Sequence, residues 1–301
     1  MKLGFIHILI ETCKGTAVYY HVLRQSPIKA FLHFLLLCIL CTGAVWLYNL
    51  PFFNRQINKV YEKINASCGP VALTENGLLP QKDPKTNRMI FSMPKLELTY
   101  IGDINAEIPK IDIGLTEAGI IWMPKVIIQW NRREDNNYLL YSIINGDSVK
   151  FQVCEKDQLV NCLKEANLDA GKGKVDTHSL YLNMLQNPLL TKASVAIGGF
   201  IGFFIVLFLQ YLFFILMVSL IFSALGSRRL QGKLFFRDYF VLNCYIAFPC
   251  ILISAIWLAV QPPFLSFQWV SILSFSIYFM IVMSRIERWL SPPPPENEPG
   301  E

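Results

Sequence analysis

Charged residues are scarce in this sequence. Only 16% of its 301 residues are Asp, Glu, Lys or Arg, whereas 53% are hydrophobic and the mean hydropathy is +0.39. An ordinary soluble domain carries about 25% charged residues, so this composition argues against a soluble enzyme, a disordered chain or a fibrous repeat. The shortage is local: residues 193–227 and 239–284 form runs of 35 and 46 residues without any charge. A membrane span needs roughly 20 apolar residues, so the sequence predicts an integral membrane protein.

Catalytic and metal-binding signatures are also missing. The chain contains no G-x-S-x-G, H-E-x-x-H, P-loop or G-x-G-x-x-G motif. Its four histidines are dispersed, and no Cys/His spacing is typical of a zinc site. We therefore expect no catalytic residue, cofactor or metal, and no nucleic-acid partner.

Four spans can be drawn, at residues 30–50, 193–227, 239–260 and 264–284. The second would be about 52 Å long as a helix, which exceeds a hydrocarbon core of roughly 30 Å, so it must tilt or project beyond the membrane. Pro262-Pro263 divides the 46-residue run, because proline breaks helices and is best placed in a tight turn.

The distribution of basic residues predicts the orientation. The short segments 1–29, 228–238 and 285–301 together hold ten Lys and Arg against six acids, whereas residues 51–192 hold seventeen against sixteen. Positive short loops stay in the cytoplasm, and long domains cross largely regardless of charge. We therefore expect both termini to be cytoplasmic and residues 51–192 to be extracytoplasmic.

The flanking segments differ in character. The leader, residues 1–29, carries apolar side chains on one helical stripe and polar side chains on the other. This pattern fits a helix in the membrane interface or one packed on the bundle. Residues 228–238 form a basic cytoplasmic loop, which could bind anionic lipid but is also what the orientation demands. The proline-rich tail, residues 285–301, is expected to be a disordered cytoplasmic end.

The inserted segment, residues 51–192, has 33 charges in 142 residues, which is close to the soluble norm. Residues 52–66 have apolar side chains at helical spacing and should extend the first span as a helix. Short β-branched or aromatic runs separated by turn residues indicate strands, and two helices are expected further along. The expected strands are 90–93, 96–101, 111–115, 120–123, 126–130 and 138–144, and the expected helices are 156–165 and 177–185. The fold class is thus an α-helical membrane bundle of four transmembrane helices plus an α+β extracytoplasmic domain inserted between helices one and two.

Small and polar residues within the spans suggest contacts. Ser194, Gly198 and Gly202 recur every four residues, a spacing that lets helices approach closely, so they could face another span or a second copy. Gln210 and Asn243 could line a pore, although hydrogen bonds between helices explain them more simply.

In the inserted domain, two further groups are candidates. Asp103, Glu107 and Asp112 form an acidic cluster that is either a solvated edge or an outer-face site. Cys154 and Cys162 could form a disulfide if the compartment oxidises thiols, and buried free thiols are an equal alternative.

Four short segments stand out beside the order of spans: IDIG at 111–114, GIIWMPK at 119–125, KLFFRDYF at 233–240 and YIAFP at 245–249. With the order of spans, these segments resemble an uncharacterised family of bacterial membrane proteins, some of which are labelled maltodextrin-utilisation membrane proteins. The leader and the tail depart from that pattern. The resemblance implies the architecture and a location in the bacterial plasma (inner) membrane, and implies no activity.

We therefore expect a non-enzymatic membrane protein whose extracytoplasmic domain binds or senses something or assists a membrane complex. Its partners would be the lipid bilayer and a membrane protein or a second copy, through the small-residue face. One alternative is a transporter component with a path through spans two to four. The other is a membrane-anchored enzyme that uses the acidic cluster.

Overall fold

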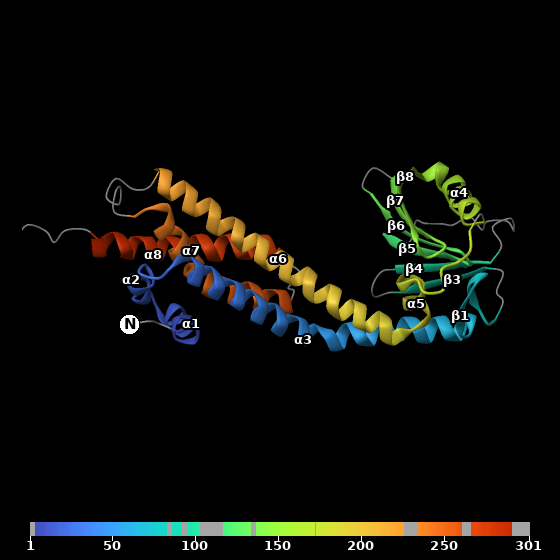
Figure 1. Ribbon diagram of the computed structural model, residues 1–301, viewed down its shortest axis with the longest axis horizontal. Coiled ribbons are helices and arrows are strands. Elements are labelled where there is room, and N and C mark those ends of the chain that lie inside the picture. Colours follow the sequence, from blue (N-terminus) through green and yellow to red (C-terminus); the bar gives the residue numbers. More distant parts are fainter. Residues whose placement is uncertain are drawn as a thin grey trace, which may run out of the picture. The chain divides into compact units, whose positions relative to one another are not determined.

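The computed structural model describes residues 4–82, 86–91, 96–102, 117–133, 137–171, 173–225, 234–260 and 266–290. The helices are α1 (Phe5–Lys14), α2 (Val18–Val22), α3 (Pro27–Cys68), the short 3-10 helix η1 (Lys156–Gln158), α4 (Leu159–Gly171), α5 (Leu180–Gln186), α6 (Pro188–Leu225), α7 (Phe236–Val260) and α8 (Phe267–Leu290). The strands are β1 (Val71–Thr74), β2 (Gly77–Pro80), β3 (Thr86–Phe91), β4 (Leu96–Ile101), β5 (Ala118–Met123), β6 (Val126–Arg132), β7 (Asn137–Ile144) and β8 (Ser148–Glu155). Figure 1 shows this order along the chain.

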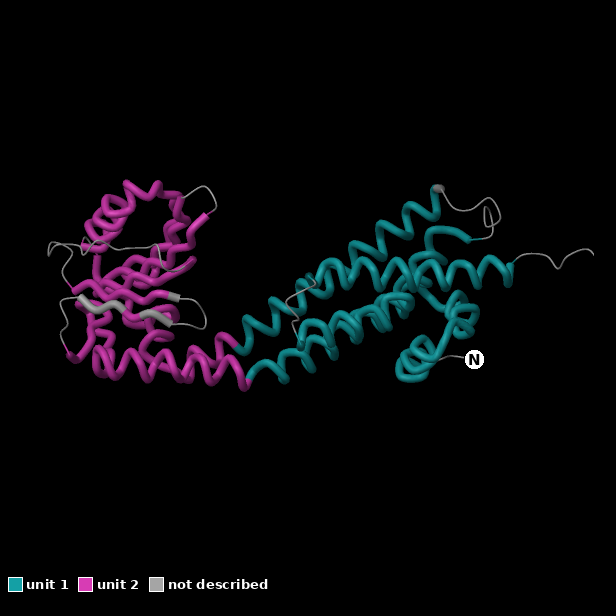
Figure 2. Tube along the Cα trace, turned by 180° about the vertical axis from the view of Figure 1, so that it is seen from behind, with its two compact units in different colours: residues 1–50, 196–301 teal, residues 51–195 magenta. Residues whose placement is uncertain are grey.

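Four helices, α3, α6, α7 and α8, are long and apolar enough to cross a membrane. The sheet and its helices are inserted between the first and the second of them, which confirms the predicted fold class. The chain divides into two compact units, residues 1–50 with 196–301 and residues 51–195, which are coloured separately in Figure 2. We describe each unit by itself.

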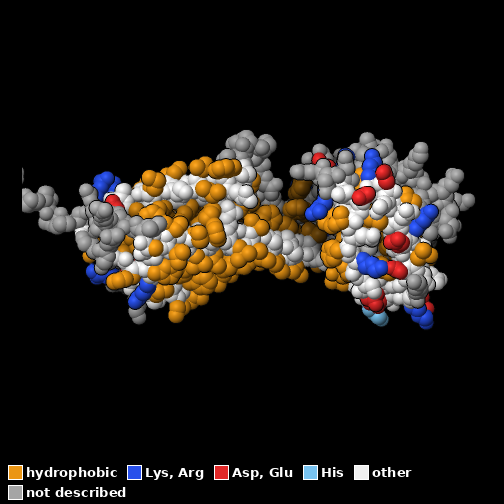
Figure 3. Space-filling model, turned by 90° about the horizontal axis from the view of Figure 1, so that it is seen from above, with side chains coloured by type: hydrophobic (Ala, Val, Ile, Leu, Met, Phe, Trp, Pro, Cys, Tyr) orange, Lys and Arg blue, Asp and Glu red, His pale blue; other side chains and the backbone are white. Residues whose placement is uncertain are grey.

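The first unit is a helical bundle centred on α7. Every side chain from 241 to 251 is buried, and Tyr245 and Phe248 have no exposed surface. In the view of Figure 3, the bundle surface is apolar along most of its length and its charged side chains gather near one end. This pattern is typical of a bundle that lipid surrounds.

The leader packs on this bundle. Ile8 of α1 and Tyr19 of α2 are fully buried in the bundle core. The Tyr19 hydroxyl donates to the Tyr245 carbonyl oxygen (3.4 Å), and the Tyr245 hydroxyl donates to Gln25 Oε1 (3.0 Å). We expected the leader either to lie in the membrane interface or to pack on the bundle, and the structure supports packing on the bundle. Ile6, on the side of α1 that does not contact the bundle, remains 69% exposed.

The second unit is a six-stranded sheet with helices on both faces. The strand order is β3-β4-β5-β6-β7-β8, with every pair antiparallel except β4 and β5. One face packs on α4. The other packs on the end of α3, the β1–β2 hairpin and α5, so two cores lie on opposite sides of one sheet (Figure 1).

Several expected elements are confirmed. Residues 52–66 continue the first span within the single helix α3, and β4, β5, β6 and β7 fall where strands were expected. The strand expected at 111–115 lies outside the described residues, as do Pro262-Pro263, residues 228–233 and the tail from 291. Strands β1, β2 and β8 were not expected.

Candidate apolar ligand site

The floor of the site is the middle of the sheet. Ile120 on β5 lies opposite Gln129 on β6, and Ile127 on β6 lies opposite Ile143 on β7. Residues directly opposite each other in adjacent strands point to the same face, so these four side chains share one surface. It is three-quarters apolar, with Gln129 as its one amide.

The first wall is the part of α3 that follows the predicted span. Phe53, Ile57, Val60 and Ile64 recur at intervals of three or four residues, which places them on one side of the helix. All four line the site, together with Phe52, Gln56 and Tyr61 of the same helix. The spacing that predicted a helix here thus also supplies an apolar wall.

The second wall comes from α5 and the first turns of α6. Asn187 caps α6, because its Oδ1 accepts from the Leu189 amide (2.9 Å), and Pro188 occupies the first helical position, where its missing N–H costs nothing. The backbone of Asn187 is extended, which separates α5 from α6. Tyr181 and Met184 on one side and Val195 on the other can therefore face the same space.

One tyrosine joins the two walls. The Tyr61 hydroxyl donates to the Met184 carbonyl oxygen and lies 2.8 Å from Thr191 Oγ1, which itself donates to the Met184 carbonyl oxygen (2.6 Å). These bonds connect α3, α5 and α6 within the second unit. They leave the apolar side of each helix free to face the sheet.

Together these residues enclose an open groove of about 640 Å³. Its lining residues are Phe52, Phe53, Gln56, Ile57, Val60, Tyr61, Ile64, Ile120, Ile127, Gln129, Ile143, Tyr181, Met184, Leu185, Thr191 and Val195. None of them is Asp, Glu, Lys, Arg or His. Small-molecule sites typically have roughly 300–1,000 Å³, are mostly apolar and hold a few polar groups, so the groove has the size and lining of a ligand site.

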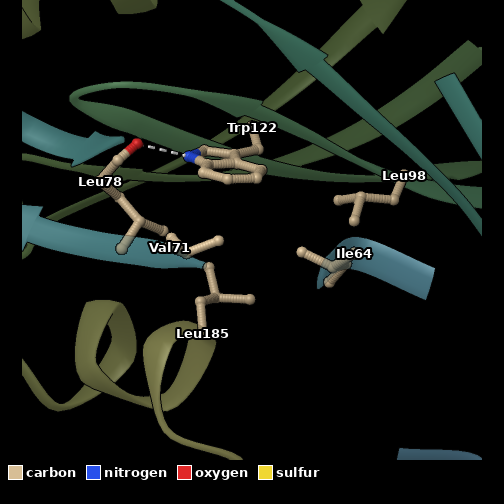
Figure 4. Close-up of a pocket in the computed structure, with 6 residues that line it drawn as sticks. All are labelled: Ile64, Val71, Leu78, Leu98, Trp122 and Leu185. Atoms are coloured by element: carbon tan, nitrogen blue, oxygen red, sulfur yellow. Dashed lines mark hydrogen bonds between the residues drawn. The ribbon is translucent and has the colours of Figure 1, made fainter. Parts of the chain in front are cut away.

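The inner end of the groove is closed by the core. Ile64 and Leu185 also line a second hollow, of only about 10 Å³, with Val71, Leu78, Leu98 and Trp122 (Figure 4). Trp122 Nε1 donates to the Leu78 carbonyl oxygen (2.9 Å), which satisfies the polar atom of this otherwise apolar wall. Such a hollow is too small for a ligand, and its apolar lining does not hold water well. A bound molecule must therefore lie along the groove and cannot enter the core.

A further phenol lies beside the groove, because Tyr141 on β7 is opposite Gln129 on β6. Partial burial, and after it a hydrogen bond with Tyr181, raises the pKa of Tyr141 beside the groove. The phenol therefore stays protonated at neutral pH. The site offers hydrogen bonds from amides and hydroxyls, without a formal charge.

Of the residues singled out in the sequence, those that the structure describes do not line the groove. Asp103, Glu107 and Asp112 are outside the described residues. Asn243 Nδ2 donates to Ser219 Oγ (2.9 Å) within the bundle, an interhelical hydrogen bond, and Gln210 is half-buried on α6. A disulfide joins Cys154 at the end of β8 to Cys162 on α4.

Among the described residues, none lies close to Gly198 or Gly202 of α6, and Ser194 is half-buried. A side chain added at Gly198 or Gly202 would meet nothing within 4 Å. The close contact is made by Gly199, where an added Cβ would lie 2.2 Å from Cη2 of Trp46. A role for Ser194, Gly198 and Gly202 toward another chain stays a prediction.

Gly199→Val is expected to destabilise the bundle, because the buried Trp46 ring must move away from α6. Overpacking of this kind costs about 1–3 kcal/mol. Gly198→Val is the matched control, since it has the same change in helix propensity and open space around it. Thermal unfolding in detergent should show a clearly lower unfolding temperature for Gly199→Val than for Gly198→Val. An equal decrease in both variants would contradict the close contact between Gly199 and Trp46.

Sequence reasoning found the helix that forms one wall but missed the groove. The groove depends on α5 and α6 folding back over the sheet, which no local pattern reports. The local signal for the groove was the apolar spacing of residues 52–66, because an apolar helix face must pack against another element.

Comparisons of the chain with protein-family models, with curated proteins and with solved structures found no match. The resemblance to the uncharacterised bacterial family therefore stays a prediction, and the groove is the feature that bears on function.

Proposed function

We propose that the protein is a non-enzymatic membrane protein whose α+β domain binds an acyl chain of a membrane lipid in the apolar groove. The observation that carries this proposal is the groove itself: about 640 Å³ with sixteen lining residues and no charged group among them. An uncharged, elongated apolar ligand fits such a lining, because burial of a charge without a partner is costly.

The two helices that wall the groove favour a lipid over other apolar molecules. Both α3 and α6 are candidate membrane spans that continue without a break into the second unit. Val195, which lines the groove, belongs to the charge-free run 193–227, and Phe52 follows the predicted span by two residues. The membrane-spanning stretches and the groove are therefore joined by continuous apolar helix.

The free energy of transfer of an acyl chain from the bilayer to the groove would be close to zero. A chain transferred from water gains about 0.8 kcal/mol for each buried CH₂ group. A chain that comes from the bilayer was already in an apolar medium, so this gain is small. Shape and the hydrogen bonds of Gln56 and Gln129 would then decide which lipid stays, and this is the behaviour of a sensor or carrier.

The lining supports binding over catalysis. General acid–base and nucleophilic catalysis need an ionisable or activated group within hydrogen-bond reach of the substrate. Among the residues that line the groove, the titratable ones are Tyr61 and Tyr181, and the Tyr61 hydroxyl is engaged by Met184 and Thr191. The groove therefore offers contact surface and hydrogen bonds.

Retained lipid tests the proposed function. Ile57→Trp should fill the groove from α3, whereas Lys59→Trp adds the same ring on an exposed position of that helix. We expect the native chain and Lys59→Trp, washed in mild detergent, to retain about one lipid per chain, and Ile57→Trp to lose it, as measured by mass spectrometry of extracted lipid. Equal retention by all three proteins would contradict binding in the groove.

We further propose that the domain is extracytoplasmic, in the plasma (inner) membrane of a bacterium, with both termini cytoplasmic. The charge distribution supports this orientation. The Cys154–Cys162 disulfide supports it too, because disulfides persist in oxidising compartments.

Reporter fusions test the orientation. A reporter that is active only outside the cytoplasm should be active when fused after Lys150 and silent when fused after Lys233. The reverse pattern would overturn the topology, whether or not the groove binds lipid.

A further inference from the structure

Strand β8 is an edge strand with an unusually apolar exposed side. It pairs with β7 over its whole length and is the last strand in the sheet order. Phe151 is 72% exposed, Val153 55% and Val149 42%. An edge strand presents unpaired N–H and C=O groups, and natural proteins usually protect it with charge, proline or a covering element.

Among the described residues, those that protect β8 lie on one face only. Gln152 Nε2 donates to Cys162 Sγ of α4 (3.4 Å), and the Lys150 ammonium pairs with Asp169 of the same helix. Side chains alternate between faces along a strand, so the odd-numbered residues point to the opposite face. There Phe151 contacts the ring of Tyr141 (centroids 4.8 Å apart), and the rest of its surface is exposed.

The apolar residues of β8 read the same in both directions. The order Val149, Phe151, Val153 is a palindrome centred on Phe151. Two antiparallel copies related by a twofold axis perpendicular to the sheet place residues of the same face opposite each other. With Phe151 on the axis, Val149 lies opposite Val153 in both halves, and Lys150 lies opposite Gln152.

We propose that β8 pairs antiparallel with β8 of a second copy of this chain, with Phe151 facing Phe151 across the twofold axis. The pairing would satisfy the backbone groups of both edges and bring the three apolar side chains of each copy into contact with those of the other. Aromatic and β-branched cross-strand pairs stabilise sheets in this way. This inference does not depend on lipid binding, and it places self-association on a surface other than the small-residue face of α6.

Neighbouring registers are less favourable. A shift of two residues in one direction brings Lys150 opposite Lys150, and the opposite shift brings Val149 opposite Glu155. In the proposed register the one like-charge pair is Glu155 with Asp147, which precedes β8 in the turn. Both are exposed, so solvent and salt screen their repulsion.

Cysteine cross-linking in membranes tests the pairing and its register. The full chain carries Cys13→Ser, which removes the exposed free thiol, and one new cysteine at 149, 151 or 153. On the axis, two copies of residue 151 lie about 5 Å apart by Cα, whereas two copies of residue 149 lie about 13 Å apart along the strands. With a thiol linker shorter than that separation, Phe151→Cys should give a covalent dimer. Val149→Cys and Val153→Cys should each give at least tenfold less covalent dimer when expressed alone. Co-expression of these two variants should restore the dimer, because residue 149 of one copy lies opposite residue 153 of the other.

Three outcomes would overturn the proposal. Phe151→Cys could give no covalent dimer, all three single variants could give the same yield of dimer, or the mass of the cross-linked product could identify a different protein. Phe151→Lys, compared with Leu180→Lys at another exposed position, gives a second measurement. The first should reduce the dimer fraction in native mass spectrometry at least tenfold, and the second should leave it unchanged. Retained dimer in Phe151→Lys would overturn the pairing without relying on cross-linking.

Discussion

Gln129→Glu is expected to weaken lipid binding by roughly ten- to a hundredfold, which corresponds to about 1.4–2.8 kcal/mol. The two side chains have nearly the same size, so the shape of the groove is kept. The variant instead places an ionised carboxylate on the floor, between Ile120 and Ile127. An acyl chain above it would strip water from the charge without supplying a partner, which is costly. Gln129 is exposed to solvent in the structure, so only part of the full burial penalty applies.

The control for this variant is Asn131→Asp. Asn131 lies two residues further along β6 on the same face, is exposed and does not line the groove. Lipid retained after detergent washing, measured by mass spectrometry, should fall for Gln129→Glu and stay at the native level for Asn131→Asp. Equal retention in both variants would place the retained lipid outside the groove.

Gly77→Ala is expected to come close to unfolding the inserted domain. Gly77 has φ of +123°, a conformation that other residues rarely adopt, and a Cβ there would lie 2.0 Å from the Pro124 carbonyl oxygen. Strained backbone costs about 1–3 kcal/mol, and overpacking adds about 1–3 kcal/mol. The next residue, Leu78, donates its amide to that same oxygen (2.7 Å), so the β1–β2 hairpin cannot move away without losing this bond. A loss of that size is a large share of a typical domain stability of 5–15 kcal/mol.

Gly171→Ala is the matched control, since a Cβ at the end of α4 meets nothing within 4 Å. We expect its effect to stay within about 0.5 kcal/mol. Limited proteolysis and thermal unfolding of the full chain in detergent would report both variants. A Gly77→Ala protein as stable as the native one would contradict the close approach of Gly77 to the Pro124 carbonyl oxygen.

The sequence predicted the elements whose patterns are local. The spans follow from charge-free runs, and the extension of α3 follows from the apolar spacing of Phe53, Ile57, Val60 and Ile64. Strand β8 also had a local signal that was overlooked. Asn145-Gly146, with φ of +55° and +92°, is a pair that favours tight hairpin turns, and it begins the three-residue loop that follows β7.

Burial on the second face of the sheet was harder to predict. Leu98 and Tyr100 alternate with Glu97 and Thr99, a pattern typical of a half-buried strand, but all four side chains are buried. Thr99 Oγ1 donates to Glu97 Oε1 (3.3 Å) inside the domain. Strand β4 lies inside a sheet that is covered on both faces, and which faces are covered depends on segments far away in the sequence. The groove was unpredictable for the same reason, because its walls come from α3, α5 and α6.

The most direct test of acyl-chain binding is a membrane lipid that carries a photoreactive group at the end of its acyl chain. After irradiation of the full chain in membranes, labelled peptides are mapped by mass spectrometry. The groove predicts labels in residues 52–64, 120–143 and 181–195, in addition to labels in the spans, and predicts that Gln129→Glu removes the labels at 120–143. Labels confined to residues 30–50 and 196–290 would show that lipid contacts only the bundle, and would contradict the proposed function.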